Sequence, residues 1–333
     1  MSTAFHRLLP AGAPAIGLGC MNLSHAYGKP LAESEALRAL SEAFEMGYRH
    51  FDTATLYGKT ANERLVGKAL GAQRGQLFLA SKCGMAFDPE IGAKRIDGRP
   101  ETLRRQCEES LKRLDTDYLD IYYLHRLDRE VPVEESVGAL ARLVEDGKIR
   151  AIGLSEISAD TLTRALTEAS IAAVQSEYSL WTRNPEIALL ETCRAAGTAL
   201  VAFSPLARGF LTATLDDVTS LEEGDIRLGM PRFSADNYRH NLTLLDEYVA
   251  MARALGCTPG QLALAWLRSQ GADIFPIPGT RRIAHMHENL GADGITLEDA
   301  TVTRLNAMMT PDQVRGPRYS EAQQAAIDTE EFG

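Results

Sequence analysis

Residues 149–179 read IRAIGLSEISADTLTRALTEASIAAVQSEYS, and this stretch combines two hydrophobic periods. Its two ends, IRAIGLS (149–155) and AAVQSEYS (172–179), are short apolar runs, whereas ADTLTRALTEA between them repeats its apolar residues at helical spacing. A strand, a helix and a strand in this order predict a parallel βαβ unit. Because the apolar runs are almost continuous, we expect both faces of the sheet to be covered.

The same alternation extends along the chain and predicts an α/β fold. Six further runs have the character of strands: AIGLG (15–19), YRHFDTA (48–54), QLFLASK (76–82), YLDIYYLH (118–125), TALVAFS (198–204) and DIFPIP (273–278). Eight strands separated by amphipathic segments favour a closed (β/α)8 TIM barrel over an open doubly wound sheet. The open sheet remains the alternative, although GLGCMN (17–22) lacks the third glycine of the dinucleotide-binding pattern G-x-G-x-x-G.

Three segments fall outside the eight repeating units. We expect a short N-terminal hairpin, a long loop after the seventh strand over residues 211–240, and a C-terminal tail from about residue 310. Long additions after barrel strands shape the face that carries the active site. No linker or low-complexity segment divides the chain, so residues 1–333 are predicted to form a single barrel domain.

Composition limits the classes of function. The chain has 333 residues, 45% hydrophobic and 24% charged, which is typical of globular proteins. A net charge of −10 disfavours binding to nucleic acid or to an anionic membrane surface. Five cysteines without C-x-x-C spacing, and the lack of a signal peptide or of an apolar run near 18 residues, favour a cytoplasmic protein. His285 and His287 would point apart on a helix, so we expect no metal site.

Polar side chains end three neighbouring strands of the predicted barrel. Asp52 ends the second strand, Lys82 the third and His125 the fourth, and Tyr57 follows Asp52 in FDTATLYG (51–58). Each alone has an ordinary structural interpretation, as a turn former, a rim charge, a core histidine or a surface anchor. Four ionisable groups at one end of adjacent strands are better explained as a functional site, because each costs desolvation unless it is paired.

These four groups together suit acid catalysis at a carbonyl. A lysine beside a tyrosine favours phenolate, and we expect Lys82 to lower the pKa of Tyr57 by roughly 2 to 3 units. Asp52 would keep Lys82 charged, and His125 would hydrogen-bond a substrate oxygen that also meets the Tyr57 hydroxyl. Such an arrangement can protonate a carbonyl oxygen while hydride reaches its carbon.

The chain resembles the aldo-keto reductase superfamily, in its NADPH-dependent microbial type, over nearly its whole length. The matching motifs are GLGCM, FDTATLYG, LASK, DIYYLHR, IGLSE, VQSEYS, FSPLARGFL and IPGTRRIAHMHENLGA, in this order and spacing. The resemblance implies that Asp52, Tyr57, Lys82 and His125 form the family's catalytic tetrad, with Tyr57 as general acid. It therefore implies an NADP-dependent alcohol dehydrogenase or carbonyl reductase.

The resemblance also implies that NADP(H) binds extended across the barrel mouth. Ser155 and Gln175 match positions that hold the nicotinamide amide, Phe203 matches a residue that stacks on the nicotinamide, and Glu156 stands where many members have Asn. The implied cofactor-binding residues are Gly19, Met21, Asp52, Ser155, Gln175, Phe203, Ser204, Leu206, Arg208, Gly209, Gly279, Thr280, Arg281, Glu288 and Asn289. Within this set, the 2′-phosphate is assigned to residues 279–281, the pyrophosphate to residues 204–209, and adenine to Glu288 and Asn289.

Two other classes of function remain open at this stage. One is an NADPH-binding regulatory or sensor subunit with little turnover, and the other is a barrel lyase that uses Lys82 as a Schiff base. Tyr27, Phe87 and Trp181 are expected to line the substrate pocket. The partner is expected to be a small carbonyl compound or alcohol, and neither its identity nor the oligomeric state can be read from the sequence.

Overall fold

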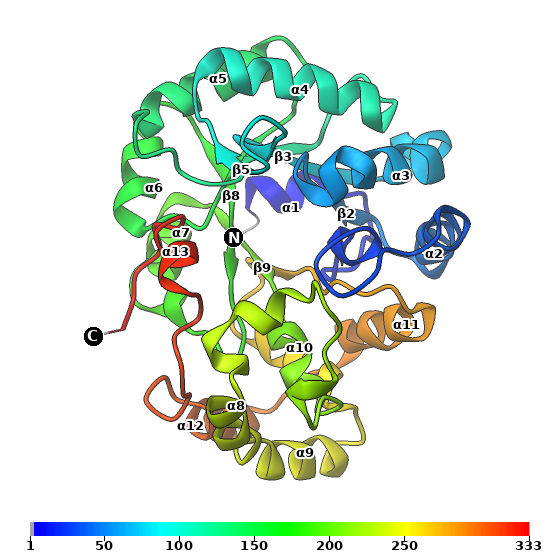
Figure 1. Cartoon of the computed structure of the whole chain (residues 1–333), viewed down its shortest axis with the longest axis vertical. Helices are drawn as coiled ribbons and strands as arrows, with labels where there is room; N and C mark the ends of the chain where they lie inside the picture. Colours follow the sequence, from blue (N-terminus) through cyan, green and yellow to red (C-terminus); the bar gives the residue numbers. More distant parts are fainter. Residues whose placement is uncertain (1–2, 333) are drawn as a thin grey trace.

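The computed structural model describes residues 3–332 and has a parallel sheet of eight strands at its centre (Figure 1). The strands are adjacent in the order β1-β2-β3-β6-β7-β8-β9-β10. Their bounds are β1 Leu18–Gly19, β2 His50–Asp52, β3 Phe78–Cys83, β6 Ile121–Leu124, β7 Ile152–Ser155, β8 Ile171–Glu177, β9 Ala199–Phe203 and β10 Ile274–Pro276. Each strand overlaps one of the eight apolar runs, so the strand predictions are confirmed.

The sheet closes on itself between its first and last strands. Gly19 forms a parallel bridge with Gly279 just beyond β10. The N–H of Gly17 donates to the carbonyl of Pro276 at 3.0 Å, and that of Gly19 donates to Pro278 at 3.2 Å. The predicted (β/α)8 barrel is therefore correct.

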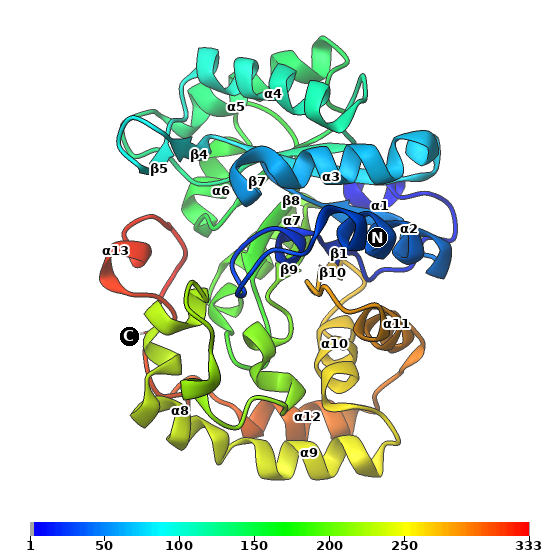
Figure 2. The same ribbon diagram turned by 45° about the vertical axis from the view of Figure 1, so that its right-hand side comes forward.

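Helices surround the strands, as Figures 1 and 2 show from two directions. The helices that alternate with the strands are α2 Glu33–Met46, α3 Ala61–Leu70, α4 Pro100–Leu114, α5 Val133–Glu145, α6 Ala159–Ala165, α7 Leu189–Ala196, α10 Pro259–Ser269 and α11 Ile283–Gly291. Local sequence sets their ends: α2 stops at Gly47, whose φ of 112° suits glycine, and Thr258 with Gln261 forms a capping box on α10. Among residues 3–332, no helix has both the length and the apolar character needed to cross a membrane.

The expected N-terminal hairpin is wrong, because the first element of the described residues is the short helix α1 Ala4–Leu8. Thr3 caps this helix by accepting a hydrogen bond from the N–H of His6. Phe5 is fully buried and packs on Phe78 and Phe275 inside the barrel, with ring centroids 4.7 Å apart in both pairs. An amphipathic turn that can cover the open bottom of the barrel is more stable here than a two-stranded hairpin without a sheet partner.

A hairpin does occur elsewhere, after the third barrel strand. It consists of β4 Met85–Asp88 and β5 Ala93–Ile96, which pair antiparallel. The expected loop over residues 211–240 contains 3-10 turns and the start of α8 Ala235–Leu242, which leads into α9 Leu245–Ala254. Beyond α12 Asp299–Met308, the C-terminal tail contains α13 Glu321–Gln324. In the view of Figure 1 the hairpin and α13 lie near the barrel mouth, whereas α9 and α12 lie at the outer edge of the molecule.

Candidate active site

The strand ends bring Asp52, Tyr57, Lys82 and His125 together. Asp52 is the last residue of β2, Lys82 lies two residues beyond the partner of Asp52 in β3, and His125 directly follows β6. Tyr57 begins the 3-10 turn Tyr57–Thr60. Because β2, β3 and β6 are neighbours in the sheet, their carboxyl ends meet on one side of the barrel mouth.

Lys82 is the centre of this cluster. Its ammonium donates to Asp52 Oδ1 at 2.5 Å, to the carbonyl of Thr53 at 2.8 Å and to the Tyr57 hydroxyl at 3.3 Å. Burial would lower the pKa of Lys82, but Asp52 and Tyr57 together outweigh burial and raise it. Lys82 is therefore a charged donor with all three of its protons directed at named acceptors.

Tyr57 does not have the lowered pKa that the sequence suggested. Partial burial in the pocket raises the pKa of the phenol, and the neighbouring Lys82 opposes this rise without cancelling it. The expectation is wrong because it counted the lysine charge and left out the lost solvation. A phenol that keeps its proton at neutral pH can still donate that proton to a substrate oxygen.

His125 lies against Tyr57 and is held neutral. The two rings meet edge to face with centroids 5.9 Å apart. Burial, with the charges of Arg126, Lys82 and Lys94, lowers the pKa of His125 well below its usual range. Its Nδ1 has no hydrogen-bond partner within residues 3–332. A neutral imidazole can direct one N–H at an oxygen in the pocket without adding a charge.

A cavity of about 670 Å³ opens beside these side chains. Asp52, Tyr57 and His125 line it, whereas Lys82 is buried behind them. All the residues that the resemblance implied for the cofactor also line this cavity: Gly19, Met21, Asp52, Ser155, Gln175, Phe203, Ser204, Leu206, Arg208, Gly209, Gly279, Thr280, Arg281, Glu288 and Asn289. One pocket therefore connects the ionisable cluster to the ends of β7, β8, β9 and β10.

Gln175 links the β8 end of the pocket to Asp52. Its side-chain amide donates to Asp52 Oδ2 at 2.8 Å, so the two oxygens of this carboxylate receive Gln175 and Lys82 separately. Ser155, at the end of β7, is buried and accepts a long hydrogen bond of 3.4 Å from Arg126. Phe203 ends β9 with its ring half-buried at the pocket wall.

The loop after β9 has an unusual backbone. Ser204, Ala207 and Arg208 have φ values of 48°, 50° and 58°, and Gly209 has φ of 96°. Left-handed conformations are uncommon for residues other than glycine, and runs of them concentrate at ligand sites. Such turns can turn successive backbone N–H groups toward an anion.

The segment after β10 contains polar side chains that leave hydrogen-bonding capacity open to the cavity. Asn289 is 3% exposed and lines the cavity, but its side-chain nitrogen has no hydrogen-bond partner in the described chain. The Arg281 guanidinium donates to the carbonyl of Lys29 at 2.8 Å, and no carboxylate of residues 3–332 pairs with it. Glu288 accepts from the Thr258 hydroxyl at 2.6 Å. Donors left open at a pocket wall are suited to a polar, anionic ligand.

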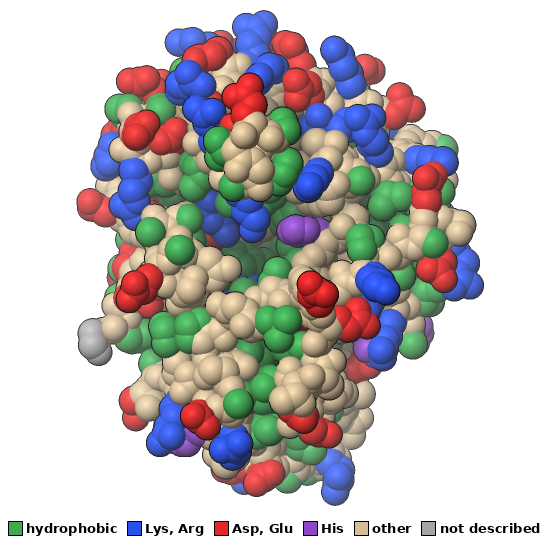
Figure 3. Space-filling view, in the orientation of Figure 1, with side chains coloured by type: hydrophobic (Ala, Val, Ile, Leu, Met, Phe, Trp, Pro, Cys, Tyr) green, Lys and Arg blue, Asp and Glu red, His purple; other side chains and the backbone are tan. Residues whose placement is uncertain are grey.

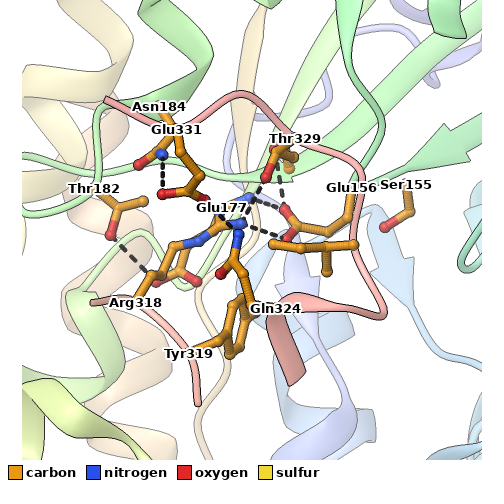
Figure 4. Close-up of polar contacts among 12 residues, drawn as sticks. Ser155, Glu156, Glu177, Thr182, Asn184, Arg318, Tyr319, Gln324, Thr329 and Glu331 are labelled. Carbon is orange, nitrogen blue, oxygen red and sulfur yellow. Dashed lines mark hydrogen bonds and ion pairs between the residues drawn. The ribbon is translucent and has the colours of Figure 1, made fainter. Parts of the chain in front are cut away.

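Glu156 does not line the pocket. It is fully buried, with φ of 53°, and its Oε1 accepts from the Ser176 hydroxyl at 3.0 Å and from the N–H of Glu177 at 2.9 Å. Its Oε2 pairs with Arg318 at 2.9 Å. Figure 4 shows Arg318 reaching from the C-terminal tail toward Glu156. Glu156 therefore anchors the tail. The sequence resemblance, in which Glu156 stands where many members have Asn, did not indicate this role.

A second ion pair ties the tail to the loop after β9. The Arg208 guanidinium donates to Glu177 Oε2 and to the Tyr319 hydroxyl, at 2.8 Å and 3.0 Å. Tyr319 in turn lines the cavity. Arg208 reaches the pocket as expected, but its charge is already compensated by a buried carboxylate.

Two of the three expected substrate-pocket residues lie elsewhere. Tyr27 lines the cavity, but Phe87 and Trp181 do not. Trp181 is 4% exposed and stacks on Phe210 with centroids 4.1 Å apart, so it belongs to the core under the loop after β9. Phe87 lies on the hairpin, and the ammonium of Lys59 lies over its ring, 3.9 Å from the ring centroid. Aromatic residues in loops are as suited to packing as to ligand contact, and composition does not separate the two roles.

The structure adds lining residues that the sequence did not single out, including His25, Lys94, Arg126 and Tyr319. Arg126 had a signal, because it follows His125 in DIYYLHR. Lys94 and Tyr319 had no such signal. Lys94 lies on the hairpin after β3, which the sequence did not predict, and the path of the tail that carries Tyr319 depends on buried ion pairs. Within residues 3–332 there is no group of three or more His, Cys, Asp or Glu side chains that could hold a metal ion.

A barrel of this topology, with an Asp, Tyr, Lys and His cluster beside a long pocket, defines a class of oxidoreductase barrels. Residues 15–309 match the family model described as the aldo/keto reductase family, and the chain belongs to that family. It is 42% identical over 311 residues to aldo-keto reductase yakc, NADP(+), of Schizosaccharomyces pombe, covering 92% of this chain and 91% of that one. It is also 42% identical to probable aldo-keto reductase 1 of Glycine max, over 91% and 88% of the two chains.

Solved structures have the same fold. A glycerol dehydrogenase of Gluconobacter oxydans superposes with a TM-score of 0.81 at 26% identity, over 88% of this chain and 90% of that one. An aldo-keto reductase of Klebsiella pneumoniae in complex with NADPH superposes with a TM-score of 0.71 at 29% identity, over 92% and 95%. These neighbours support the barrel assignment independently of the sequence motifs.

Proposed function

We propose that this protein is an NADPH-dependent oxidoreductase that reduces an aldehyde or ketone to an alcohol, with Tyr57 as the general acid. The observation that supports it most is the set of three hydrogen bonds from Lys82 to Asp52, Thr53 and Tyr57 at the end of the pocket. This set keeps a cation beside the phenol that must lose and regain a proton. The name of the Schizosaccharomyces pombe relative includes NADP(+), and the Klebsiella pneumoniae neighbour is a complex with NADPH; both agree with this cofactor.

The residues around the pocket fit the cofactor. Arg281, which pairs with no described carboxylate, suits a 2′-phosphate, and the unpartnered side-chain nitrogen of Asn289 suits an adenine. The left-handed turns of residues 204–209 suit a pyrophosphate. Ser155 and Gln175 would hold the nicotinamide amide, with Phe203 against the ring. When bound, NADPH supplies a hydride for the carbonyl carbon.

The chain's own residues then handle the carbonyl oxygen and its proton. The Tyr57 hydroxyl and the neutral His125 would both hydrogen-bond this oxygen, which polarises the carbonyl. Tyr57 would give its proton to the oxygen as negative charge develops there, and Lys82 would stabilise the resulting phenolate. Asp52 holds Lys82 in place and keeps it charged. The raised pKa of Lys82 also argues against a Schiff-base lyase, which requires a neutral amine.

The test is NADPH absorbance decay with a panel of carbonyl compounds, for wild type and for Lys82→Met. We expect the substitution to lower turnover at least about 100-fold, because the phenolate loses its cation in a partly desolvated site. Binding of NADPH, measured by its fluorescence, should persist in the variant. Turnover in the variant above about a tenth of wild type would remove Lys82 from the mechanism. Strong NADPH binding by wild type without turnover of any compound would favour a regulatory subunit.

A further inference from the structure

We infer that the substrate end of the pocket binds an anionic group, so that the preferred substrate is an aldehyde or ketone that also carries a carboxylate. This inference rests on the proposed reductase function and adds a substrate class to it. Its basis is a pair of cations, Lys94 and Arg126, which line the cavity together with His25 beside Tyr57 and His125.

These side chains lie beside the reacting groups. Arg126 follows His125, and its guanidinium donates to the carbonyl of His125 at 2.6 Å. The ring of His25 stacks on that of Tyr57, with centroids 6.5 Å apart. Lys94 lies on β5 of the hairpin, which directly follows the strand of Lys82. Figure 3 shows the central hollow of this face with basic and histidine side chains at its edge.

No carboxylate neutralises the charges of Lys94 and Arg126. Neither Lys94 nor Arg126 forms an ion pair with any residue of the described chain. The acids that flank them in sequence are already engaged: Asp97 pairs with Arg99, and Asp128 accepts from the N–H groups of Gly98 and Glu130. By contrast, Arg208 and Arg227, which also line the cavity, are paired with Glu177 and Asp225. The positive charge near Tyr57 is therefore left for a ligand.

The cofactor does not account for these charges. The positions suited to its phosphates lie after β9 and β10, at residues 204–209 and 279–281. Lys94 and Arg126 come from the loops after β3 and β6. In the closed barrel, β1 and β2 separate this pair of strands from β9 and β10 on one side, and β7 and β8 separate them on the other, so the two cations lie across the mouth. Only the substrate would occupy this side of the pocket.

The cations also disfavour one another when the pocket holds no anion. Loss of solvation and the charge of Arg126 both lower the pKa of Lys94, although this residue is exposed at the rim of the cavity. Burial and the charge of Lys94 lower the pKa of His25. A carboxylate between these side chains would relieve this repulsion and receive a forked donor from Arg126.

A matched pair of substrates tests the inference: 4-carboxybenzaldehyde and its uncharged methyl ester, methyl 4-formylbenzoate. The ester withdraws more electron density, so intrinsic reactivity favours the ester. We expect kcat/KM at low ionic strength to be roughly tenfold or more higher for the acid, mainly through KM, because two partly exposed cations meet the charge. Added NaCl should reduce this ratio.

Lys94→Met should bring the ratio of acid to ester several-fold closer to one. Arg95→Met is the matched control, because Arg95 is the next residue on β5, carries the same charge and does not line the cavity. Its ratio should remain that of wild type. As a measurement that needs no turnover, benzoate should bind to the NADPH-saturated protein more tightly than benzamide.

Equal kcat/KM for acid and ester in wild type would overturn the anion site while the reductase function stands. An equal fall of the ratio in Arg95→Met and Lys94→Met would also overturn it, because the effect would then be one of net charge. Failure of both compounds, and of all other carbonyls, to consume NADPH would instead overturn the proposed function on which the inference rests.

Discussion

Tyr57 shows how opposing influences meet on one side chain. Partial burial raises the pKa of its phenol, whereas Lys82, 3.3 Å away, lowers it, and the outcome is a raised pKa. A folded pKa above the ordinary value keeps the proton on Tyr57 at every pH below it. Reduction needs the protonated phenol, and alcohol oxidation needs the phenolate.

The first prediction at this scale concerns pH. We expect the rate of carbonyl reduction to stay level through neutral pH and to fall only in strongly alkaline solution, as Tyr57 loses its proton. The rate of alcohol oxidation should rise over the same alkaline range. Pre-steady-state rates of NADPH consumption and formation measure both limbs, and Tyr57→Phe should abolish them. A loss of reduction near neutral pH, or parallel profiles in the two directions, would rule out this role of Tyr57.

Arg281 supports the second residue-scale prediction. Its guanidinium is half-buried at the cavity wall, and a guanidinium fork matches the oxygens of a phosphate. Arg281→Ala should weaken NADPH binding by roughly 5- to 150-fold, because a charged hydrogen bond is worth about 1 to 3 kcal/mol. NADH, which lacks the 2′-phosphate, is the matched control and should bind almost as before. Equal losses for both nucleotides would show that Arg281 supports the fold or the adenosine.

At the scale of elements, the C-terminal tail is attached to the barrel mouth by buried charges and by a helix end. Arg318 and Glu156 are 1% and 0% exposed and pair at 2.9 Å. Asp328 accepts from the hydroxyls of Ser158 and Thr161, at the first turn of α6. The tail in this way holds Tyr319 against the cavity.

A double-mutant cycle at this ion pair is the third prediction. Arg318→Met alone should lower the free energy of unfolding by about 3 to 5 kcal/mol, because it leaves Glu156 buried without its cation. Glu156→Gln combined with Arg318→Met should cost less than the sum of the two single changes. Urea denaturation measures these energies, and limited proteolysis should cut the tail first in Arg318→Met. Additive energies would mean that the pair does not hold the tail.

At the scale of the whole molecule, the barrel has two packed layers. Aromatic residues, alanines and the branched residues Ile121, Val201 and Ile277 fill its interior, and Phe5 of α1 covers the bottom. His50 belongs to this interior and is 1% exposed. Its ring meets the rings of Phe5 and Phe78 edge to face, and neither ring nitrogen has a hydrogen-bond partner in residues 3–332. Burial lowers the pKa of His50 from 6.5 to about 4.

This histidine leads to the fourth prediction, on stability in acid. Between pH 6.5 and about 4 the unfolded chain binds a proton at His50 that the folded chain does not, so stability falls over this window as pH decreases. The full effect is about 3 kcal/mol. His50→Leu, of similar volume, should lose less of its thermal stability between pH 7 and pH 4.5 than wild type. Parallel losses in the two proteins would contradict the buried, neutral state of His50.

Local hydrophobic pattern was sufficient to predict the eight strands, the parallel barrel and the strand ends at which Asp52, Lys82 and His125 meet. Hydrophobic period depends on neighbours within one strand or helix, so it survives without knowledge of distant contacts. FDTATLYG likewise placed Tyr57 within reach of Lys82, because a short turn leaves the chain few other paths.

The other features depend on contacts between residues that are distant in the chain. The pKa of Tyr57 depends on how much solvent its neighbours remove, and the burial of Trp181 depends on the loop that covers it. The position of Glu156 depends on Arg318, which lies 162 residues away in the chain. Long-range pairing and desolvation are properties of the folded surface rather than of any local pattern, and for that reason the tail, the hairpin and the cations near Tyr57 had to be seen in the structure.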